Sequence, residues 1–166
     1  MSTPVLVAYA TKRESTHEVA DAVAAWLRER GYEVDVRAAA EVGTLRPYSA
    51  VVVGGALYMG RWHRDAQRFL ATHRDELARV PVAVFAMGPL KLEQTDIDAS
   101  RHQLDHALAK EHALEPVSVA IFGGVIDPAK LRFPFTRMDA ADARDWATIR
   151  AWADEIAGRF AEPAAA

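Results

Sequence analysis

Near its amino end the chain reads Pro4-Val-Leu-Val-Ala-Tyr-Ala-Thr-Lys-Arg-Glu-Ser-Thr-His17, an apolar run followed by a turn rich in hydroxyl groups. The run predicts a buried strand over residues 5–10, and the pattern after it predicts a helix from Thr16. A helix that begins just after a strand presents unpaired N–H groups and the positive end of its dipole to the turn. With the hydroxyls of Thr11, Ser15 and Thr16, these groups favour a phosphate monoester. The alternative is an ordinary capped helix start, with Ser15 or Thr16 as the N-cap.

Three further apolar runs, rich in valine, are closed by turn residues: Ala50–Leu57, Val82–Met87 and Val117–Phe122. Continuous runs of this kind are typical of strands that are buried on both faces of a parallel sheet. Glu33–Arg37 alternates valine with charged residues and predicts an edge strand. Helical patterns lie between the strands, over residues 16–30, 64–80, 97–112 and 142–160. This alternation predicts a doubly wound α/β sheet that binds ligands where its strands end.

The composition bounds the classes of protein to which the chain can belong. Its 166 residues, 51% hydrophobic and 26% charged, predict one domain over residues 1–162 with a frayed tail at 163–166. A net charge of −3 argues against a general nucleic-acid binder. The absence of cysteine excludes disulfides, thiolate metal sites and cysteine nucleophiles. We see no leader-like segment and no apolar stretch near the ~20 residues of a membrane span, so the expected location is the cytoplasm.

Two turns after predicted strands offer groups for a planar ligand. Residues 58–63 follow Gly54-Gly55, and their large aromatics Tyr58 and Trp62 could stack on a ring. The alternative is that Trp62 packs on the neighbouring helix. Backbone groups of the turn at residues 88–96 could also face a ring, although this segment taken alone favours an ordinary strand–helix loop.

The remaining candidates carry less specific chemistry. The turn at residues 123–139 mixes apolar and basic residues, which suits an acidic amphipathic substrate, a membrane surface or a partner, or else covers the sheet edge. His102 and His106 are four residues apart on one helical face, a spacing that metal sites use, but no third ligand is evident. His63 is the nearest acid–base candidate by position, but a histidine at the rim of the sheet needs no catalytic role to explain it. We assign no catalytic residue and no metal ligand.

The turns resemble those of FMN proteins with the flavodoxin fold. More narrowly, the chain resembles the flavodoxin-domain group that includes menaquinone-dependent protoporphyrinogen oxidase. The segments that carry the resemblance are Tyr9–Ala22, Val53–His63, Phe122–Gly124 and Arg144–Trp152. It spans most of the chain, and the second and last segments are the specific ones. The resemblance implies a flavodoxin-like, doubly wound, five-stranded parallel sheet flanked by helices, with FMN as the cofactor.

The resemblance also implies a set of binding residues. The FMN phosphate would lie on Thr11, Lys12, Arg13, Ser15 and Thr16. The isoalloxazine ring would lie among residues from three turns, namely Ala56, Leu57, Tyr58, Gly60, Trp62, Gly88, Pro89, Leu90, Gly123 and Gly124. The implied redox partner is a small molecule or quinone, with a porphyrinogen substrate and a role in heme biosynthesis, and the turn at residues 125–139 would help to form that site. Self-association and peripheral membrane contact through Leu131–Phe135 are further expectations.

One residue departs from the family pattern. Glu14 stands where the family turn usually carries glycine, and it places a negative charge close to the phosphate. If the turn needs a positive φ there, a residue with a β-carbon costs roughly 1–2 kcal/mol. Two interpretations follow, an FMN-dependent oxidoreductase or electron carrier, and a flavodoxin-like binding or regulatory module that has lost tight FMN binding.

Overall fold

The computed structural model of the protein describes residues 4–11, 14–90, 92–111, 114–126 and 141–162. The main sheet contains β1 (Val5–Ala10), β2 (Val34–Ala38), β3 (Ala50–Tyr58), β4 (Arg61–Trp62), β5 (Val82–Met87) and β6 (Ser118–Phe122). A small second sheet contains β7 (Val125–Ile126) and β8 (Ala141–Asp142). The helices are α1 (Glu14–Glu29), η1 (Ala39–Glu41, a 3-10 turn), α2 (Arg64–Thr72), α3 (Arg74–Leu77), α4 (Gln94–Leu108) and α5 (Trp146–Ala161).

Five parallel strands form the body of the main sheet, in the order β2-β1-β3-β5-β6. Val7 of β1 pairs with Val36 of β2 on one side and with Val52 of β3 on the other. The strand order reverses between β1 and β3, so the switch point at which such sheets bind ligands lies there. The predicted five-stranded parallel sheet is confirmed, and β2 lies at its edge as the sequence indicated. The short β4 adds an antiparallel partner to β3.

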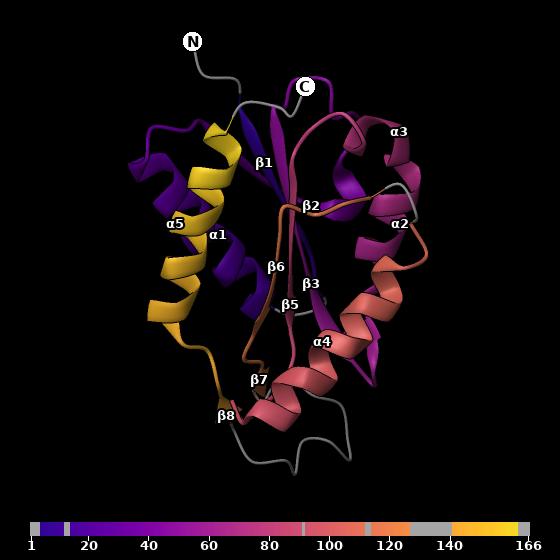
Figure 1. Ribbon diagram of the computed structural model, residues 1–166, viewed down its shortest axis with the longest axis vertical. Coiled ribbons are helices and arrows are strands. Elements are labelled where there is room, and N and C mark those ends of the chain that lie inside the picture. The colour runs from indigo at the N-terminus through magenta and orange to yellow at the C-terminus, as the bar shows by residue number, and fades with distance from the viewer. Residues whose placement is uncertain (1–3, 12–13, 91, 112–113, 127–140, 163–166) are drawn as a thin grey trace.

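Helices cover both faces of the sheet (Figure 1). The helices α1 and α5 lie on one face, and α2, α3 and α4 lie on the other. Alternation along β1 sends Val5 and Val7 into the core under α1 and α5, while Leu6 and Ala8 enter the core on the opposite face. All six residues of β5 are buried, as expected of a strand covered on both faces. The sheet is therefore the rigid layer on which the turns are mounted.

Several predicted boundaries need correction. The helix predicted from Thr16 begins at Glu14, and the helix predicted over residues 64–80 is two helices that meet at His73. The helix predicted over residues 97–112 is α4, which begins three residues earlier and ends at Leu108. The last helix begins at Trp146 and not at residue 142, because the Asp145 carboxylate caps it by accepting hydrogen bonds from the N–H groups of Ala147 and Thr148. The predicted tail at residues 163–166 lies outside the described residues.

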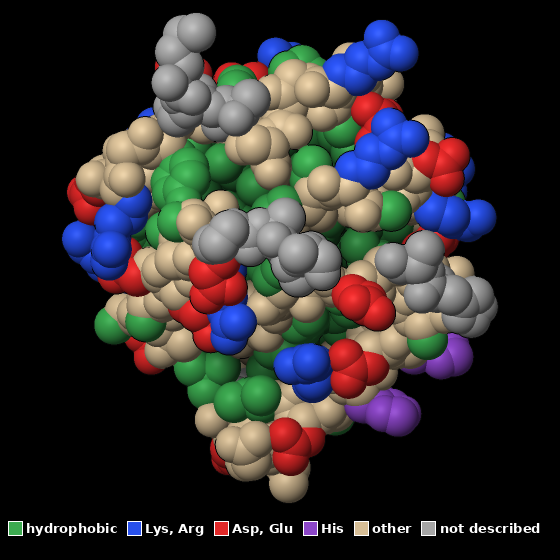
Figure 2. Space-filling view, turned by 45° about the horizontal axis from the view of Figure 1, so that its top comes forward, with side chains coloured by type: hydrophobic (Ala, Val, Ile, Leu, Met, Phe, Trp, Pro, Cys, Tyr) green, Lys and Arg blue, Asp and Glu red, His purple; other side chains and the backbone are tan. Residues whose placement is uncertain are grey.

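The surface carries both signs of charge. Figure 2 shows basic and acidic side chains side by side on the viewed face, with apolar side chains between them. On the viewed face, basic and acidic side chains thus alternate and form no single block of one sign. None of the helices in the described ranges combines the length and apolar character that a bilayer crossing requires.

Candidate functional site

The turn after β1 leads into the first helix at the switch point of the sheet. Lys12 and Arg13 lie outside the described residues, and Thr11 and Ser15 are half-buried. The Thr16 side chain is fully buried, and its Oγ1 has no hydrogen-bond partner among the described residues. A buried hydroxyl usually has a partner, so an oxygen supplied from outside the chain would satisfy it. The Thr16 hydroxyl and the N–H groups at the N-terminus of α1 are the kinds of donor that an oxyanion accepts from.

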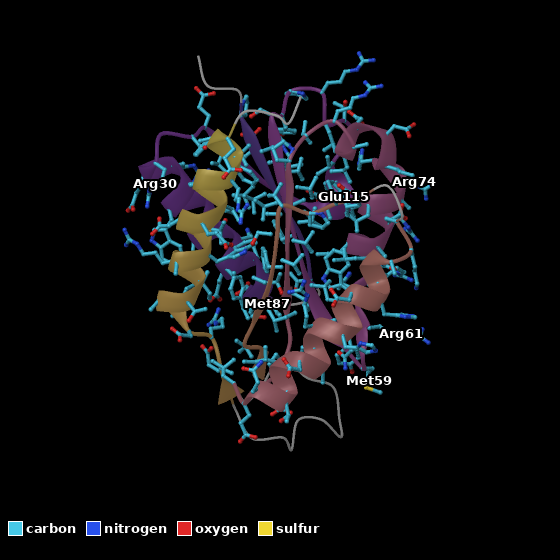
Figure 3. All side chains as sticks on the ribbon, viewed as in Figure 1. Arg30, Met59, Arg61, Arg74, Met87 and Glu115 are labelled. Atoms are coloured by element: carbon cyan, nitrogen blue, oxygen red, sulfur yellow. The ribbon has the colours of Figure 1, made fainter. Side chains whose placement is uncertain are left out.

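The turn after β3 is a tight hairpin that joins β3 to β4. Leu57 pairs with Trp62 and Tyr58 pairs with Arg61, which leaves Met59 and Gly60 as the two turn residues. Both have positive φ, +52° for Met59 and +78° for Gly60, as a type I′ hairpin turn requires. The Tyr58 side chain is 62% exposed and that of Met59 is 81% exposed. In Figure 3, Met59 and Arg61 extend outward from this hairpin.

The hairpin turns Trp62 inward, so of the two interpretations of this ring the packed one agrees with the structure. Trp62 is 4% exposed, and its Nε1–H donates a 3.1 Å hydrogen bond to the carbonyl oxygen of Gly55. A Cβ on Gly55 would lie 2.7 Å from that Nε1, and a Cβ on Gly54 would lie 2.0 Å from the ring of Phe85. Gly55 therefore leaves room for the Trp62 ring and Gly54 for the Phe85 ring, and neither glycine is needed to make room for a ligand. Tyr58 is therefore the accessible aromatic residue of this turn.

The turns after β5 and β6 are joined through their backbones. The N–H of Gly88 donates to the carbonyl of Phe122 at 2.8 Å, and the N–H of Gly124 donates to the carbonyl of Pro89 at 2.9 Å. A Cβ on Gly124 would lie 2.7 Å from the carbonyl oxygen of Gly88, and one on Gly123 would lie 2.0 Å from that of Ala143. Gly123 and Gly124 are thus required by close packing of the chain, and both are buried.

A cavity of about 410 Å³ lies between the hairpin, the turn after β5 and α4. Five of its lining residues belong to the ring-binding set of the sequence analysis, namely Leu57, Gly60, Gly88, Pro89 and Leu90. Four others come from one face of α4, namely Asp96, Ala99, Ser100 and Gln103. The volume lies in the range of small-molecule pockets, and the structure thereby brings two of the predicted turns together around one space. The helix wall was not predicted.

The sequence profile of the flavodoxin domain matches residues 6–138, most of the chain. This chain belongs to the flavodoxin domain family. FMN is the cofactor of flavodoxins. No curated protein sequence matches the chain significantly.

Solved flavodoxins share the fold over nearly the whole length of both chains. A cysteine-substituted flavodoxin from Pseudomonas aeruginosa has a TM-score of 0.62 and 19% identity, over 96% of this chain and 99% of that one. Oxidised flavodoxin 1 from Bacillus cereus has a TM-score of 0.64 and 15% identity, over 95% and 99%. Oxidised flavodoxin 2 from the same organism has a TM-score of 0.61 and 21% identity, over 95% and 99%. Identities this low support the shared fold alone.

Glu14, the departure from the flavodoxin pattern, is the first residue of α1 and is exposed. Its φ is not positive, so the backbone-strain argument against FMN is removed. An acidic residue in the first turn of a helix is favourable toward the helix dipole. What remains of the objection is charge, because Glu14 and an anion would share the same helix end.

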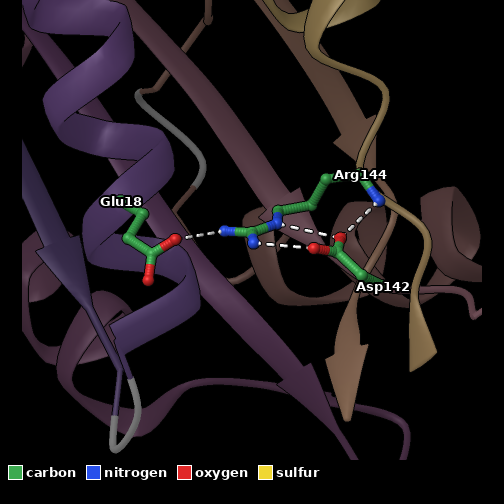
Figure 4. Close-up of polar contacts among 3 residues, drawn as sticks. All are labelled: Glu18, Asp142 and Arg144. Carbon is green, nitrogen blue, oxygen red and sulfur yellow. Dashed lines mark hydrogen bonds and ion pairs between the residues drawn. The ribbon is translucent and has the colours of Figure 1, made fainter. Parts of the chain in front are cut away.

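A second charged residue near the start of α1 is Arg144, which lies just before α5 in the sequence. Arg144 donates two hydrogen bonds to the two carboxylate oxygens of Asp142, at 3.0 and 2.8 Å, and a third at 2.8 Å to Glu18 of α1 (Figure 4). The Arg144 side chain is 11% exposed and lies over the Trp146 ring at 4.9 Å. These hydrogen bonds lower the pKa of Asp142, and those to Asp142 above all raise the pKa of Arg144. The resemblance had marked the segment from Arg144, but this role was not predicted.

His102 and His106, the pair with metal-site spacing, both lie on α4. Both side chains are exposed to solvent. Among the described residues, no group of three or more potential ligand side chains is placed to hold a metal ion. His63 lies at the N-cap of α2, where its Nδ1 accepts a hydrogen bond from the N–H of Asp65 at 3.0 Å. A structural part in starting that helix accounts for its position.

Proposed function

We propose that this chain binds FMN at the carboxyl ends of β1, β3 and β5 and acts as a redox protein, either an electron carrier or an oxidoreductase. The observation that carries the proposal is the fully buried Oγ1 of Thr16, which has no hydrogen-bond partner within the described part of the chain. It lies in the first turn of α1, a 16-residue helix that begins at the switch point of the sheet. A phosphate oxygen there would satisfy both the hydroxyl and the helix N-terminus.

The proposed phosphate ligands are the turn residues named from the sequence, Thr11, Lys12, Arg13, Ser15 and Thr16. The proposed ring site lies between the hairpin and the turn after β5, with Tyr58 and Leu90 as its exposed apolar residues. When bound, the flavin supplies the redox chemistry of the protein. The chain orients it and limits the access of water, and no side chain is assigned as an acid or base.

The finer proposal is an oxidoreductase related to menaquinone-dependent protoporphyrinogen oxidase, with a quinone or porphyrinogen as its small-molecule partner. Its support is the sequence of residues 53–63 and 144–152. The turn that would form much of the substrate site, residues 127–139, lies outside the described residues. So do Leu131–Phe135, and therefore membrane contact through them and self-association stay predictions. Anaerobic mixing of the FMN-loaded protein with a reduced porphyrinogen, monitored by flavin absorbance, tests this proposal; an unchanged spectrum contradicts it.

The second candidate is a binding or regulatory module without tight FMN binding. The observation that favours it is the carboxylate of Glu14 at the helix end where the phosphate would lie. Its charge repels a dianion, whereas the helical backbone at this position presents no strain. The two candidates therefore differ in whether the hydroxyls and N–H groups outweigh one negative charge.

Titration of the apoprotein with FMN, monitored by flavin fluorescence, tests these candidates. We expect saturable binding that inorganic phosphate weakens, and about tenfold weaker binding for Thr16→Val, which removes one hydrogen-bond donor. Thr95→Val, at an exposed position of α4, is the matched control and should bind as the wild type does. Glu14→Gln should bind more tightly. If FMN binds Glu14→Gln but not the wild type, the module without FMN is the correct candidate.

A further inference from the structure

The main sheet ends in two edge strands that are guarded differently. Each of them, β2 and β6, pairs with one neighbour only among the described strands. An edge strand turns unpaired N–H and C=O groups outward, and soluble proteins guard it with charged side chains, proline or a bulge. β2 is guarded in this way, because the charged side chains of Asp35 and Arg37 are exposed along it. That edge is therefore a poor template for another strand.

The opposite edge strand, β6, has none of these guards. Its sequence, Ser-Val-Ala-Ile-Phe, contains no charged residue and no proline. Its pairing with β5 runs without a break from Ser118 to Phe122, so no bulge turns the edge away. The first four residues of β6 are half-buried, whereas every residue of β5 is buried. In Figure 1 the sheet is seen nearly edge-on, and β6 lies between α5 and α4. The edge thus has the character of a strand that another strand covers.

The side-chain hydrogen bonds of β6 are already made within the chain. The Ser118 hydroxyl donates to the Glu155 carboxylate at 2.6 Å and accepts from Nε1–H of Trp152 at 2.8 Å. Ser118 carries the one polar side chain of this strand. The remaining hydrogen-bonding groups of β6 are therefore those of its backbone, and half of these face away from β5 in a parallel pair. These are the groups that a further strand would bind.

The sequence of β6 selects a second copy of the chain as that strand. Val119-Ala120-Ile121 reads almost the same in both directions. When two copies pair antiparallel about Ala120, Val119 lies opposite the partner's Ile121, and pairs of β-branched residues stabilise antiparallel strands. Val119 and Ile121 pack on the α4 face of the sheet, and the small Ala120 packs on the α5 face. Because β6 is uncharged, its own side chains do not repel each other across the seam.

We propose that two copies of this chain associate through β6, with the two strands antiparallel and a two-fold axis at Ala120. The association joins the two main sheets into one and is closed, because each copy uses the same edge. The strands of the two copies run in opposite directions, so the carboxyl ends of their strands lie at opposite ends of the dimer. The proposal does not rest on FMN binding.

Sedimentation equilibrium of the full chain, over a wide range of protein concentration, tests the proposal. We expect a particle of twice the chain mass that dissociates on dilution. Ala120→Lys and Ala120→Glu each place like charges face to face at the axis, and each should weaken association at least about tenfold. An equal mixture of the two variants should associate again, because opposite charges then meet. Ala38→Lys, at a half-buried alanine of β2, is the matched control and should associate as the wild type does.

Three results would overturn the proposal. They are a wild-type protein that stays monomeric up to its solubility limit, a dimer that survives in both charge variants, and a mixture of the variants that does not associate. Amide hydrogen exchange of the wild type decides the matter if a variant does not fold. Exchange along β6 should slow as protein concentration rises, while exchange along β2 stays constant. Exchange along β6 that is independent of concentration contradicts the proposed interface.

Discussion

Arg144 and Glu18 are 126 positions apart in the sequence, yet Nη1 of Arg144 lies 2.8 Å from Oε2 of Glu18. The contact joins the segment before α5 to the second turn of α1, the helix whose N-terminus is the proposed phosphate site. Asp142 holds the guanidinium in place through two further hydrogen bonds. The contact therefore ties α1 to a segment that is far from it in the sequence.

Removal of this guanidinium should destabilise the fold. We expect Arg144→Gln to lower the free energy of unfolding by about 1–3 kcal/mol, because the Arg144 side chain is mostly buried and its bonds to carboxylates are lost. Urea denaturation measures the change. Arg150→Gln is the matched control, since Arg150 pairs with Glu29 at the exposed surface and such pairs contribute about 0–1 kcal/mol. Equal losses in the two variants would contradict a special role for Arg144.

The same contact makes stability depend on acidity. Hydrogen bonds from Arg144 hold the pKa of Asp142 below its ordinary value of 3.8. Because the folded-state pKa is the lower one, this stabilisation is complete above the unfolded-state pKa and is lost as pH falls through the folded-state pKa. We expect the free energy of unfolding to fall below about pH 4, and to fall less steeply in Arg144→Gln. Parallel pH profiles for the two proteins would refute the assignment.

The hairpin turn should tolerate and even favour a change at Met59. This residue holds a φ of +52°, a conformation that costs a side chain other than asparagine, aspartate or glycine roughly 1–2 kcal/mol. Asn-Gly is the preferred pair for such a turn, so Met59→Asn should stabilise the protein by about 1 kcal/mol. Chemical denaturation checks the shift in midpoint at constant slope. Met59→Leu, which keeps the strain, should show no gain.

The glycines at the end of β3 should resist substitution. A Cβ on Gly54 would fall 2.0 Å from the Phe85 ring, so Gly54→Ala should destabilise the protein by about 1–3 kcal/mol or more. Gly158 provides the contrast, because it is exposed on α5 and a Cβ there meets nothing within 4 Å. Gly158→Ala should stabilise the helix by up to roughly 1 kcal/mol. Thermal unfolding of the two variants should therefore shift in opposite directions.

The buried parts of the fold could be predicted from the sequence, since strands covered on both faces must be continuously apolar. Val5–Ala10 and Val82–Met87 appear in the structure with the predicted bounds. The hairpin could not be predicted, because Met59-Gly60 lacks the Asn-Gly pair that usually marks such a turn. Once the chain folds back there, alternation along β4 sends Arg61 outward and Trp62 inward.

The candidate site also has a part that could be predicted from the sequence and a part that could not. The proposed phosphate turn follows a recognisable strand, and the order of elements along the chain indicates its place at the switch point. The α4 wall was missed because Asp96, Ser100 and Gln103 belong to a helix with ordinary surface composition. Only the packing of that helix against the hairpin gives these residues a common cavity. The role of Arg144 was missed because one of its partners, Glu18, is 126 positions away in the sequence.

The inward position of Trp62 gives the protein an internal optical reporter. Its indole is buried and donates a hydrogen bond to the Gly55 carbonyl. A movement of the hairpin toward a ligand would therefore change the surroundings of that ring. A change in the wavelength of tryptophan emission on ligand addition, absent in Trp62→Phe, would record that movement without any label.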